Sequence, residues 1–215
     1  MNDRVTISTK LARRENKVLR PRDAGDVYAH PRSEFERLLE QAVLSHICTG
    51  YYALAPMERL GDPRWRPDLA AVALGIAQAD YGRDAVALMS ITAAGRHGAL
   101  PRAIATAVVA VPKQRPVLHT NVGDVVFVKR DVGRLDLERV ETELTAGWMT
   151  TPEQTALDIA ARPKLGGIEE ADAASILRAL SRKIDWAVTE ELARDQHRPA
   201  ALARVREAYA TALGW

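Results

Sequence analysis

The sequence predicts an α+β protein in two parts, in which a small helical module ending in a hairpin precedes a larger α/β domain. Two β-prone runs, 43–47 and 51–54, flank a glycine-bearing turn, as in a hairpin. Runs rich in β-branched residues at 104–111 and 124–128 predict a small sheet. After Thr151 the apolar pattern is helical, so the second domain is expected to end in helices.

The first 55 residues follow the order helix, helix, short connection, helix and hairpin. Ile7–Arg14 and Pro21–Ala29 predict the first two helices, the second opened by a proline where no intrahelical hydrogen bond is lost. Pro31–Gln41 predicts the third, with apolar residues on one face and a capping box of Ser33 and Glu36. This order is typical of a winged helix-turn-helix, with 31–41 as the recognition helix and the hairpin as the wing.

The second part has three clear element signals. A helical pattern runs from Pro67 to about Tyr81, and another covers Ser90–Arg96 with Ser90 as its N-cap. The segment 140–149 is a weaker strand candidate. The sharpest signal is Thr151-Pro152-Glu153-Gln154, in which a capping threonine and a proline at the first helical position start a helix to about Ala161.

A shift in composition divides the chain. Two prolines and a glycine lie in 56–64, which predicts a short linker between a domain at 1–55 and a domain at 65–215. Three further helices are expected near Ala171–Lys183, Trp186–Arg194 and Ala200–Leu213.

Composition indicates a folded chain without a strong overall charge. Of 215 residues, 47% are hydrophobic and 27% charged, and the formal net charge is only +2, so any binding surface must be local. Cys48 is the only cysteine, which excludes an intramolecular disulfide. With no signal-like or membrane-spanning apolar run, we expect a cytoplasmic protein without membrane contact.

The sequence gives no sign of a metal or cofactor. Gly95-Arg96-His97-Gly98 matches neither G-x-G-x-x-G nor a phosphate loop with Lys-Ser/Thr. The five histidines are scattered and lack the spacing of metal ligands. Asp124 and Lys129 lie on a strand as nuclease residues do, but without the D/E-x-K spacing or a partner acid. Ser90 and Cys48 favour capping and packing over nucleophilic roles, so no catalytic residue is assigned and we expect a protein that is not an enzyme.

The local charge at the N-terminus indicates nucleic-acid binding. Residues 1–22 hold seven basic residues against two acidic ones, a net charge of +5. Such residues supply most nonspecific affinity for DNA, because they contact phosphates. The candidate phosphate contacts are Lys10, Arg13, Arg14, Lys17, Arg20 and Arg22, and Arg4 belongs to the same basic run.

On the third helix, Arg32, Ser33 and Arg37 are the candidates for base contacts, because arginine binds guanine O6 and N7 together. Three glutamates, at 34, 36 and 40, share that helix and repel phosphates. The alternative is that the module mediates protein contacts. Residues 141–191 are acidic, with ten acidic residues against five basic ones and a net charge of −5, which suits a basic partner or a solvated helical surface.

Three segments carry a further signal. Arg20–Leu54 ends its hairpin in Gly-Tyr-Tyr-Ala-Leu, Ser90–Gly98 has the sequence Ser-Ile-Thr-Ala-Ala-Gly-Arg-His-Gly, and Thr151–Asp158 has Thr-Pro-Glu-Gln-Thr-Ala-Leu-Asp. In this order they resemble the AbiEi family of antitoxins, the transcriptional regulators of type IV toxin-antitoxin systems. The resemblance spans most of residues 20–165, although the hairpin segment Ser45–Thr49 lacks the arginines common in that family's wing.

The resemblance implies an antitoxin that counteracts a nucleotidyltransferase-like toxin and represses its own operon by binding inverted repeats in the promoter. The expected partners are double-stranded promoter DNA and the cognate toxin, with the C-terminal domain neutralising the toxin and monomers pairing on the repeats. Direct toxin binding, competition for its target and modification of the toxin remain open. The alternatives are a nuclease-like enzyme targeted by the winged module, a regulator without a toxin partner, or an interaction protein that contacts no DNA.

Overall fold

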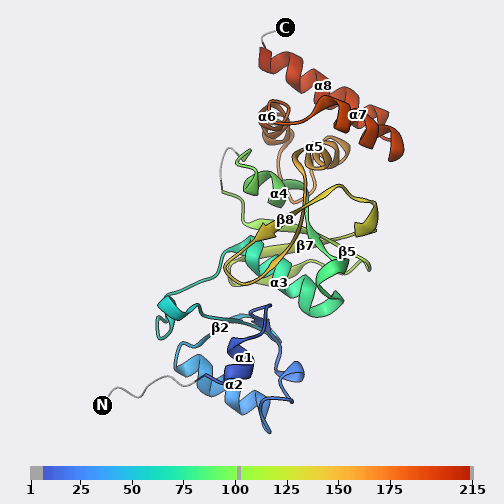
Figure 1. Cartoon of the computed structure of the whole chain (residues 1–215). Helices are drawn as coiled ribbons and strands as arrows, with labels where there is room; N and C mark the ends of the chain where they lie inside the picture. The colour runs from blue at the N-terminus through green and yellow to red at the C-terminus, as the bar shows by residue number, and fades with distance from the viewer. Residues whose placement is uncertain (1–6, 101–102, 214–215) are drawn as a thin grey trace.

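The computed structural model describes residues 7–100 and 103–213, in which eight α-helices and two sheets form an α+β fold. Figure 1 shows them arranged in layers: the N-terminal module, the helix α3 (Leu69–Tyr81), a six-stranded sheet, and a stack of C-terminal helices. The α+β class predicted from the sequence is therefore confirmed. Residues 1–6, which include Arg4, lie outside the described part.

The N-terminal module joins short helices to a three-stranded sheet of order β1-β3-β2, antiparallel throughout. The hairpin predicted by the two β-prone runs is confirmed, with Gly50 in its turn at φ +85°. The elements in chain order are α1 (Thr9–Ala12), β1 (Val18–Leu19), the 3-10 helix η1 (Pro21–Asp23), α2 (Pro31–Glu40), β2 (Leu44–Cys48) and β3 (Tyr51–Leu54).

Two helix predictions for this module were wrong in extent. The expected helix Pro21–Ala29 is only the single turn η1, followed by a turn at 25–27, because Gly25 and the nearby Pro31 do not sustain a helix. The helix expected at Ile7–Arg14 is reduced to α1.

The prediction for the third helix was more accurate. α2 starts at Pro31 with His30 as N-cap and no side-chain cap, so the capping box of Ser33 and Glu36 was wrong. Its buried residues are Phe35 and Leu38, which pack into a small core with Leu11, Leu19 and Leu54.

Helix α3 lies between the module and the sheet and is buried on both sides. Asp68 caps it by accepting the N–H of Ala71 at 3.1 Å, and Gly82 ends it at φ +88°. Every residue from Ala70 to Gln78 is buried, so the predicted helix is covered on all sides over this stretch. One apolar cluster contains Val18 and Ile47 of the module together with α3 and the sheet, so the two parts share a core.

Packing between the module and α3 is closest at Gly75. A Cβ placed on Gly75 would lie 2.3 Å from Cγ2 of Val18, so only glycine permits this approach. The Asn16 side chain donates to the Gly75 carbonyl at 2.8 Å and accepts the Val18 N–H at 2.9 Å. At the other side of the module, Asn121 donates to the carbonyls of Ile47 at 3.0 Å and His46 at 2.5 Å along the free edge of β2.

The larger sheet has the order β6-β7-β5-β4-β9-β8, with β5 and β7 parallel, β4 and β9 parallel, and the other neighbours antiparallel. The strands predicted at 104–111 and 124–128 are confirmed as β5 and β7. The single strand expected at 140–149 was wrong: it spans the end of β8, a turn and most of β9. The strands are β4 (Ala87–Leu88), β5 (Thr106–Val111), β6 (Leu118–Thr120), β7 (Gly123–Lys129), β8 (Leu137–Glu141) and β9 (Ala146–Thr150).

Both faces of this sheet are covered, because alternate residues of β5 enter different cores. Ala107 and Val109 belong to the core on the α3 side, whereas Val108 and Ala110 belong to the core of the C-terminal helices. The remaining described elements are the 3-10 helices η2 (Met57–Arg59), η3 (Arg83–Ala85) and η4 (Val132–Arg134), and the α-helices α4 (Ser90–Arg96), α5 (Pro152–Ala161), α6 (Glu170–Leu180), α7 (Trp186–Asp195) and α8 (Pro199–Leu213).

The start signal at Thr151 is confirmed, since its hydroxyl accepts the N–H of Gln154 and α5 ends at Ala161. Helix α4 is also confirmed, but Met89 and not Ser90 is its N-cap. Ser90 is the first helical residue, at φ +53° and 1% exposed, and its Oγ has no hydrogen-bond partner among the described residues. His97, the C-cap of α4, contacts the carbonyl of Thr150 at 2.9 Å, and α4 packs against α5.

The division into 1–55, 56–64 and 65–215 stays a prediction, and its bounds include residues 1–6 and 214–215 outside the described part. The predicted linker contains the short helix η2 and is followed by Trp65, which is buried in the shared core. Within 7–100 and 103–213, no helix combines the length and the apolar character needed to span a lipid bilayer.

We predict that Gly75→Ala destabilises the protein by about 1–2 kcal/mol, measured by chemical denaturation. A methyl group there meets Val18, and overpacking of this kind costs about 1–3 kcal/mol, more than the roughly 1 kcal/mol that alanine adds to helix stability. Gly25→Ala is the matched control, because a Cβ at Gly25 meets no atom within 4 Å. Equal stabilities of the two variants would contradict the close packing.

Candidate nucleic-acid interface

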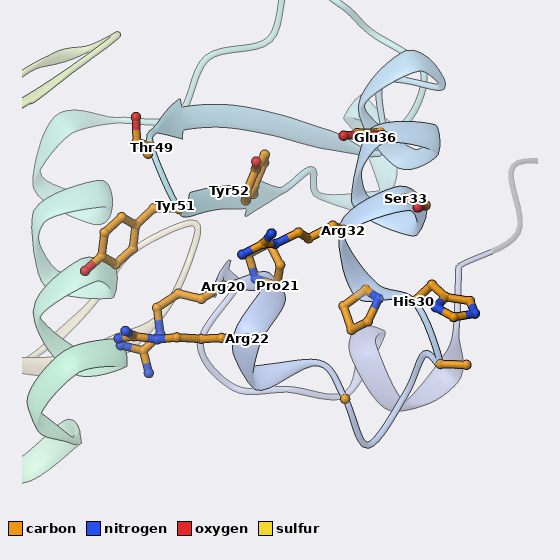
Figure 2. A pocket seen from close by; sticks show the side chains of 14 residues that line it. Arg20, Pro21, Arg22, His30, Arg32, Ser33, Glu36, Thr49, Tyr51 and Tyr52 are labelled. Carbon is orange, nitrogen blue, oxygen red and sulfur yellow. The ribbon is translucent and has the colours of Figure 1, made fainter.

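An open pocket of about 830 Å³ lies on the N-terminal module, between η1, the start of α2 and the tip of the β2–β3 hairpin (Figure 2). Most of its labelled lining side chains are basic or hydrogen-bonding. They are Arg20, Arg22, His30, Arg32, Ser33, Glu36, Thr49, Tyr51 and Tyr52. The structure therefore brings four of the predicted site residues, Arg20, Arg22, Arg32 and Ser33, to one pocket.

The three arginines differ in how strongly the protein holds them. Arg20 is 13% exposed and forms ion pairs with Asp23 and Asp80. Arg22 is 69% exposed, and its nearest contact with Asp80 is 3.6 Å long. Arg32 is exposed and, among the described residues, has no ion pair or hydrogen bond, and it extends from α2 toward Pro21 and Tyr52 (Figure 2). Arg22 and Arg32 are thus the two cations most available to a ligand.

The first turn of α2 adds donors to the same pocket. Pro31 has no N–H, and His30 provides no side-chain cap, so the N–H groups of Arg32 and Ser33 have neither an intrahelical nor a capping acceptor. These groups and the helix macrodipole favour negative charge at the N-terminus. Ser33 in this turn is exposed and presents its hydroxyl to solvent.

Asp80 on the last turn of α3 organises the arginines on the side of the pocket near the second domain. Its Oδ1 accepts from Arg20 at 2.5 Å and from the hydroxyl of Tyr51 at 2.9 Å. Its Oδ2 accepts from the same hydroxyl at 2.7 Å and from Arg115. The carboxylate is only 11% exposed, so one buried charge ties the module, α3 and the segment after β5 together.

The environment of Asp80 keeps its partners protonated. Burial alone lowers the pKa of Arg20, but hydrogen bonds and attraction from Asp23 and Asp80 outweigh it, so this pKa is raised. Burial and the hydrogen bond to Asp80 raise the pKa of Tyr51. Arg20 therefore stays a cation and Tyr51 a hydrogen-bond donor across the physiological range.

The other predicted phosphate contacts do not line this pocket. The guanidinium of Arg14 pairs with Asp26 at 2.7 Å, and Lys10 donates to the Asp26 carbonyl at 3.3 Å. Lys17 donates to the carbonyls of Ala12 and Arg14 at the end of α1, so it caps a helix.

Two further candidates lie apart from the pocket. Arg13 is exposed, and its side chain has no polar partner among the described residues. Arg37 is also exposed, but it pairs with Glu34 and donates to Gln41 at 2.9 Å. The hydrogen bond that Arg37 donates to Glu34, against a smaller opposing effect of burial, raises the pKa of Arg37. A base contact by this arginine would have to replace an existing partner.

Sequence reasoning missed the residues that position Arg20. Asp80, Tyr51 and Arg115 come from three segments that meet only in the fold. One signal was present: Asp80 is an acid in the last turn of a helix, where the macrodipole disfavours negative charge, so a cationic partner was to be expected.

The residues considered for catalysis do not form a site. Asp124 on β7 contacts His119 at 2.7 Å, and both are well exposed. Across the described part of the chain, no three His, Cys, Asp or Glu side chains are grouped to hold a metal ion. Cys48 packs in the core with α3, and burial raises the pKa of its thiol, which disfavours the nucleophilic thiolate.

No family model matches the chain, and no curated protein matches it significantly.

We predict that Asp80→Asn lowers the free energy of unfolding by about 2–3 kcal/mol, because it leaves Arg115 partly buried without a counter-charge and leaves Arg20 with Asp23 as its one acidic partner among the described residues. Glu15→Gln is the control, since Glu15 pairs with Arg83 but is 79% exposed, and such pairs contribute less than about 1 kcal/mol. Urea denaturation of both variants checks the difference, and a loss in Asp80→Asn no larger than the control would reject the organising role of Asp80.

Proposed function

We propose that the chain is a DNA-binding antitoxin and autorepressor of the AbiEi type, which contacts promoter DNA through its N-terminal module. The observation that carries the DNA-binding half is the gathering of Arg20, Arg22 and Arg32 around one open pocket at the start of α2. Cationic side chains beside free backbone N–H groups suit a phosphate of the duplex.

The topology of the module supports a winged helix-turn-helix. The short helix α1, a short strand, the turn η1, the longer helix α2 and a hairpin follow one another, and the hairpin pairs with the first strand in the order β1-β3-β2. In this interpretation η1 takes the place of the middle helix, α2 is the recognition helix and β2–β3 is the wing. Arg32 and Ser33 then lie at the N-terminal end of α2, the end that contacts bases in such proteins.

The contacts divide into two kinds. Arg20 and Arg22 serve as phosphate contacts beside η1, with Arg13 as an outlying one. Arg32 and Ser33 contact bases or the adjoining backbone, whereas Arg37 first has to leave Glu34. The hairpin contributes Thr49 and Tyr52 but no arginine to the pocket lining. In this proposal it positions the module on the DNA backbone and adds no positive charge.

The antitoxin half rests on the resemblance of Ser90–Gly98 and Thr151–Asp158 to AbiEi segments. These segments lie in the second domain, where α4 and α5 pack against one another. We infer that this domain neutralises a nucleotidyltransferase-like toxin, with the acidic residues of 141–191 as candidates for contacting a basic enzyme.

We predict that Arg22→Gln and Arg32→Gln each weaken binding to the operon promoter about tenfold in a gel shift. Losing the phosphate contact of Arg22 should also flatten the slope of log K against log salt by about 0.9 unit, because each contact to a phosphate releases about 0.9 counterion. Arg206→Gln on α8 removes the same charge far from the pocket and should bind as the wild type does (Figure 1). Wild-type affinity and slope in Arg22→Gln/Arg32→Gln would exclude this pocket as the interface.

The antitoxin role predicts relief of growth arrest when the full chain is co-expressed with a toxin encoded next to its gene. Arg22→Gln/Arg32→Gln should retain this relief while losing promoter binding, because neutralisation is assigned to the second domain. An adjacent toxin whose growth arrest the wild-type chain does not relieve would refute the antitoxin role but leave DNA binding intact.

A further inference from the structure

A second pocket, of about 960 Å³, lies in the larger domain where the end of β7 and the turn η4 face the connection between α7 and α8. It shares no lining residue with the pocket of the N-terminal module. Its polar lining includes Lys129, Arg130, Arg134, Gln196, His197 and Arg198.

The backbone holds its two central arginines firmly. Arg130 follows β7, and its N–H donates to Val111 at 2.9 Å, which continues the pairing with β5. On the other side of the pocket, α7 ends in a Schellman turn, in which His197 has φ +53°. The N–H of His197 donates to the carbonyl of Arg194 at 3.1 Å, and the N–H of Arg198 donates to the carbonyl of Ala193 at 2.7 Å. This turn leads directly into α8 and fixes the backbone position of Arg198.

A single buried carboxylate draws the two arginines together. Oδ1 of Asp158, on α5, accepts from Nη1 of Arg130 at 3.0 Å and from Nη1 of Arg198 at 2.7 Å. Asp158 is 1% exposed at its side chain, whereas the arginines are 19% and 22% exposed. The pocket lining together with Asp158 holds four basic and four acidic side chains, so an anion would be attracted by the placement of the two arginines and not by a net charge.

Donor capacity is left over at this pair. A guanidinium carries five N–H donors, and among the described residues each arginine has a hydrogen bond from Nη1 alone. The amides of Gln154 and Gln196 bond to one another beside Asp158, at 2.5 and 3.2 Å, and so limit its rearrangement. The remaining donors are therefore available to an acceptor that enters the pocket.

The surroundings also favour an anion. Lys129 and Arg134 are exposed at the pocket, and the N-terminus of the 15-residue helix α8 adds the positive end of a helix dipole. Three aspartates line the pocket as well, but Asp131 accepts the Gly133 N–H at 3.1 Å and Asp84 accepts from the Trp148 indole at 3.2 Å. These bonds offset part of the repulsion from Asp131 and Asp84, whereas Asp195 remains an acidic residue of the lining.

We propose that this pocket binds a small molecule that carries a phosphate or diphosphate group, with Arg130 and Arg198 donating to its oxygens. Two planar guanidinium groups match the several oxygens of such a group, and the pocket has the volume of a small-molecule site rather than of a lone ion. Asp158 is a positioning residue, because it orients both arginines without reaching the ligand.

Titration of the full chain with pyrophosphate, followed by calorimetry at constant ionic strength, tests the proposal. We expect saturable binding, weakened at least tenfold in Arg198→Gln and in Arg130→Gln. Arg64→Gln, an exposed arginine outside this pocket, is the charge-matched control and should bind normally. Arg22→Gln/Arg32→Gln should also bind normally, which separates this site from the DNA interface.

Two comparisons decide the chemical class of the ligand. Inorganic phosphate should bind more weakly than pyrophosphate, and citrate at the same concentration should not compete with it. Absence of pyrophosphate binding to the wild-type chain, undiminished binding in Arg198→Gln, or equal binding of citrate would each overturn the proposal. If Arg130→Gln or Arg198→Gln unfolds because its ion pair with Asp158 is lost, Arg134→Gln replaces it in the titration. Arg134→Gln should weaken pyrophosphate binding several-fold, and wild-type affinity in this variant would overturn the proposal.

Discussion

The fold depends on burying α3 on both sides at once. One side lies on the six-stranded sheet, and the other receives the N-terminal module at Gly75 and Asp80. Gly75 permits the approach because it lacks a side chain, and Asp80 compensates the charge of Arg20 and Arg115 that the approach buries. Without Gly75, Val18 could not reach the helix. Without Asp80, Arg115 would be left partly buried with no counter-charge, and Arg20 would keep Asp23 as its one acidic partner in the described part of the chain. Apolar contact and ion pairing thus act at the same junction.

The sequence predicted best those elements that local chemistry determines. Thr151-Pro152 gave the start of α5, and the β-branched runs gave β5 and β7, because capping and strand propensity act over a few residues. The short strands β4 and β6 carry too few residues for a pattern, and their pairing comes from the sheet. The prediction of a helix at Pro21–Ala29 was wrong, because a favourable proline at the start does not offset the helix-destabilising effect of a glycine four residues later.

The candidate interface was only partly predictable for a related reason. Charge counting identified the basic N-terminus, but counting does not show which cations are already engaged. Lys17 caps α1 and Arg14 pairs with Asp26, whereas Arg32 on α2 has no partner among the described residues. The distinction depends on Asp26, Asp80 and the helix ends, which become neighbours of these side chains only in the folded chain. The same holds for Asp158, whose two arginines lie 28 and 40 residues away.

The contact between Asn121 and β2 limits how copies of the chain can associate. β2 is one of the two outer strands of the three-stranded sheet, and an outer strand offers unpaired carbonyl and N–H groups to any second chain. Asn121, in the turn before β7, donates hydrogen bonds to the carbonyls of His46 and Ile47 on that strand. Extension of the small sheet by a neighbouring copy is therefore hindered at the β2 edge.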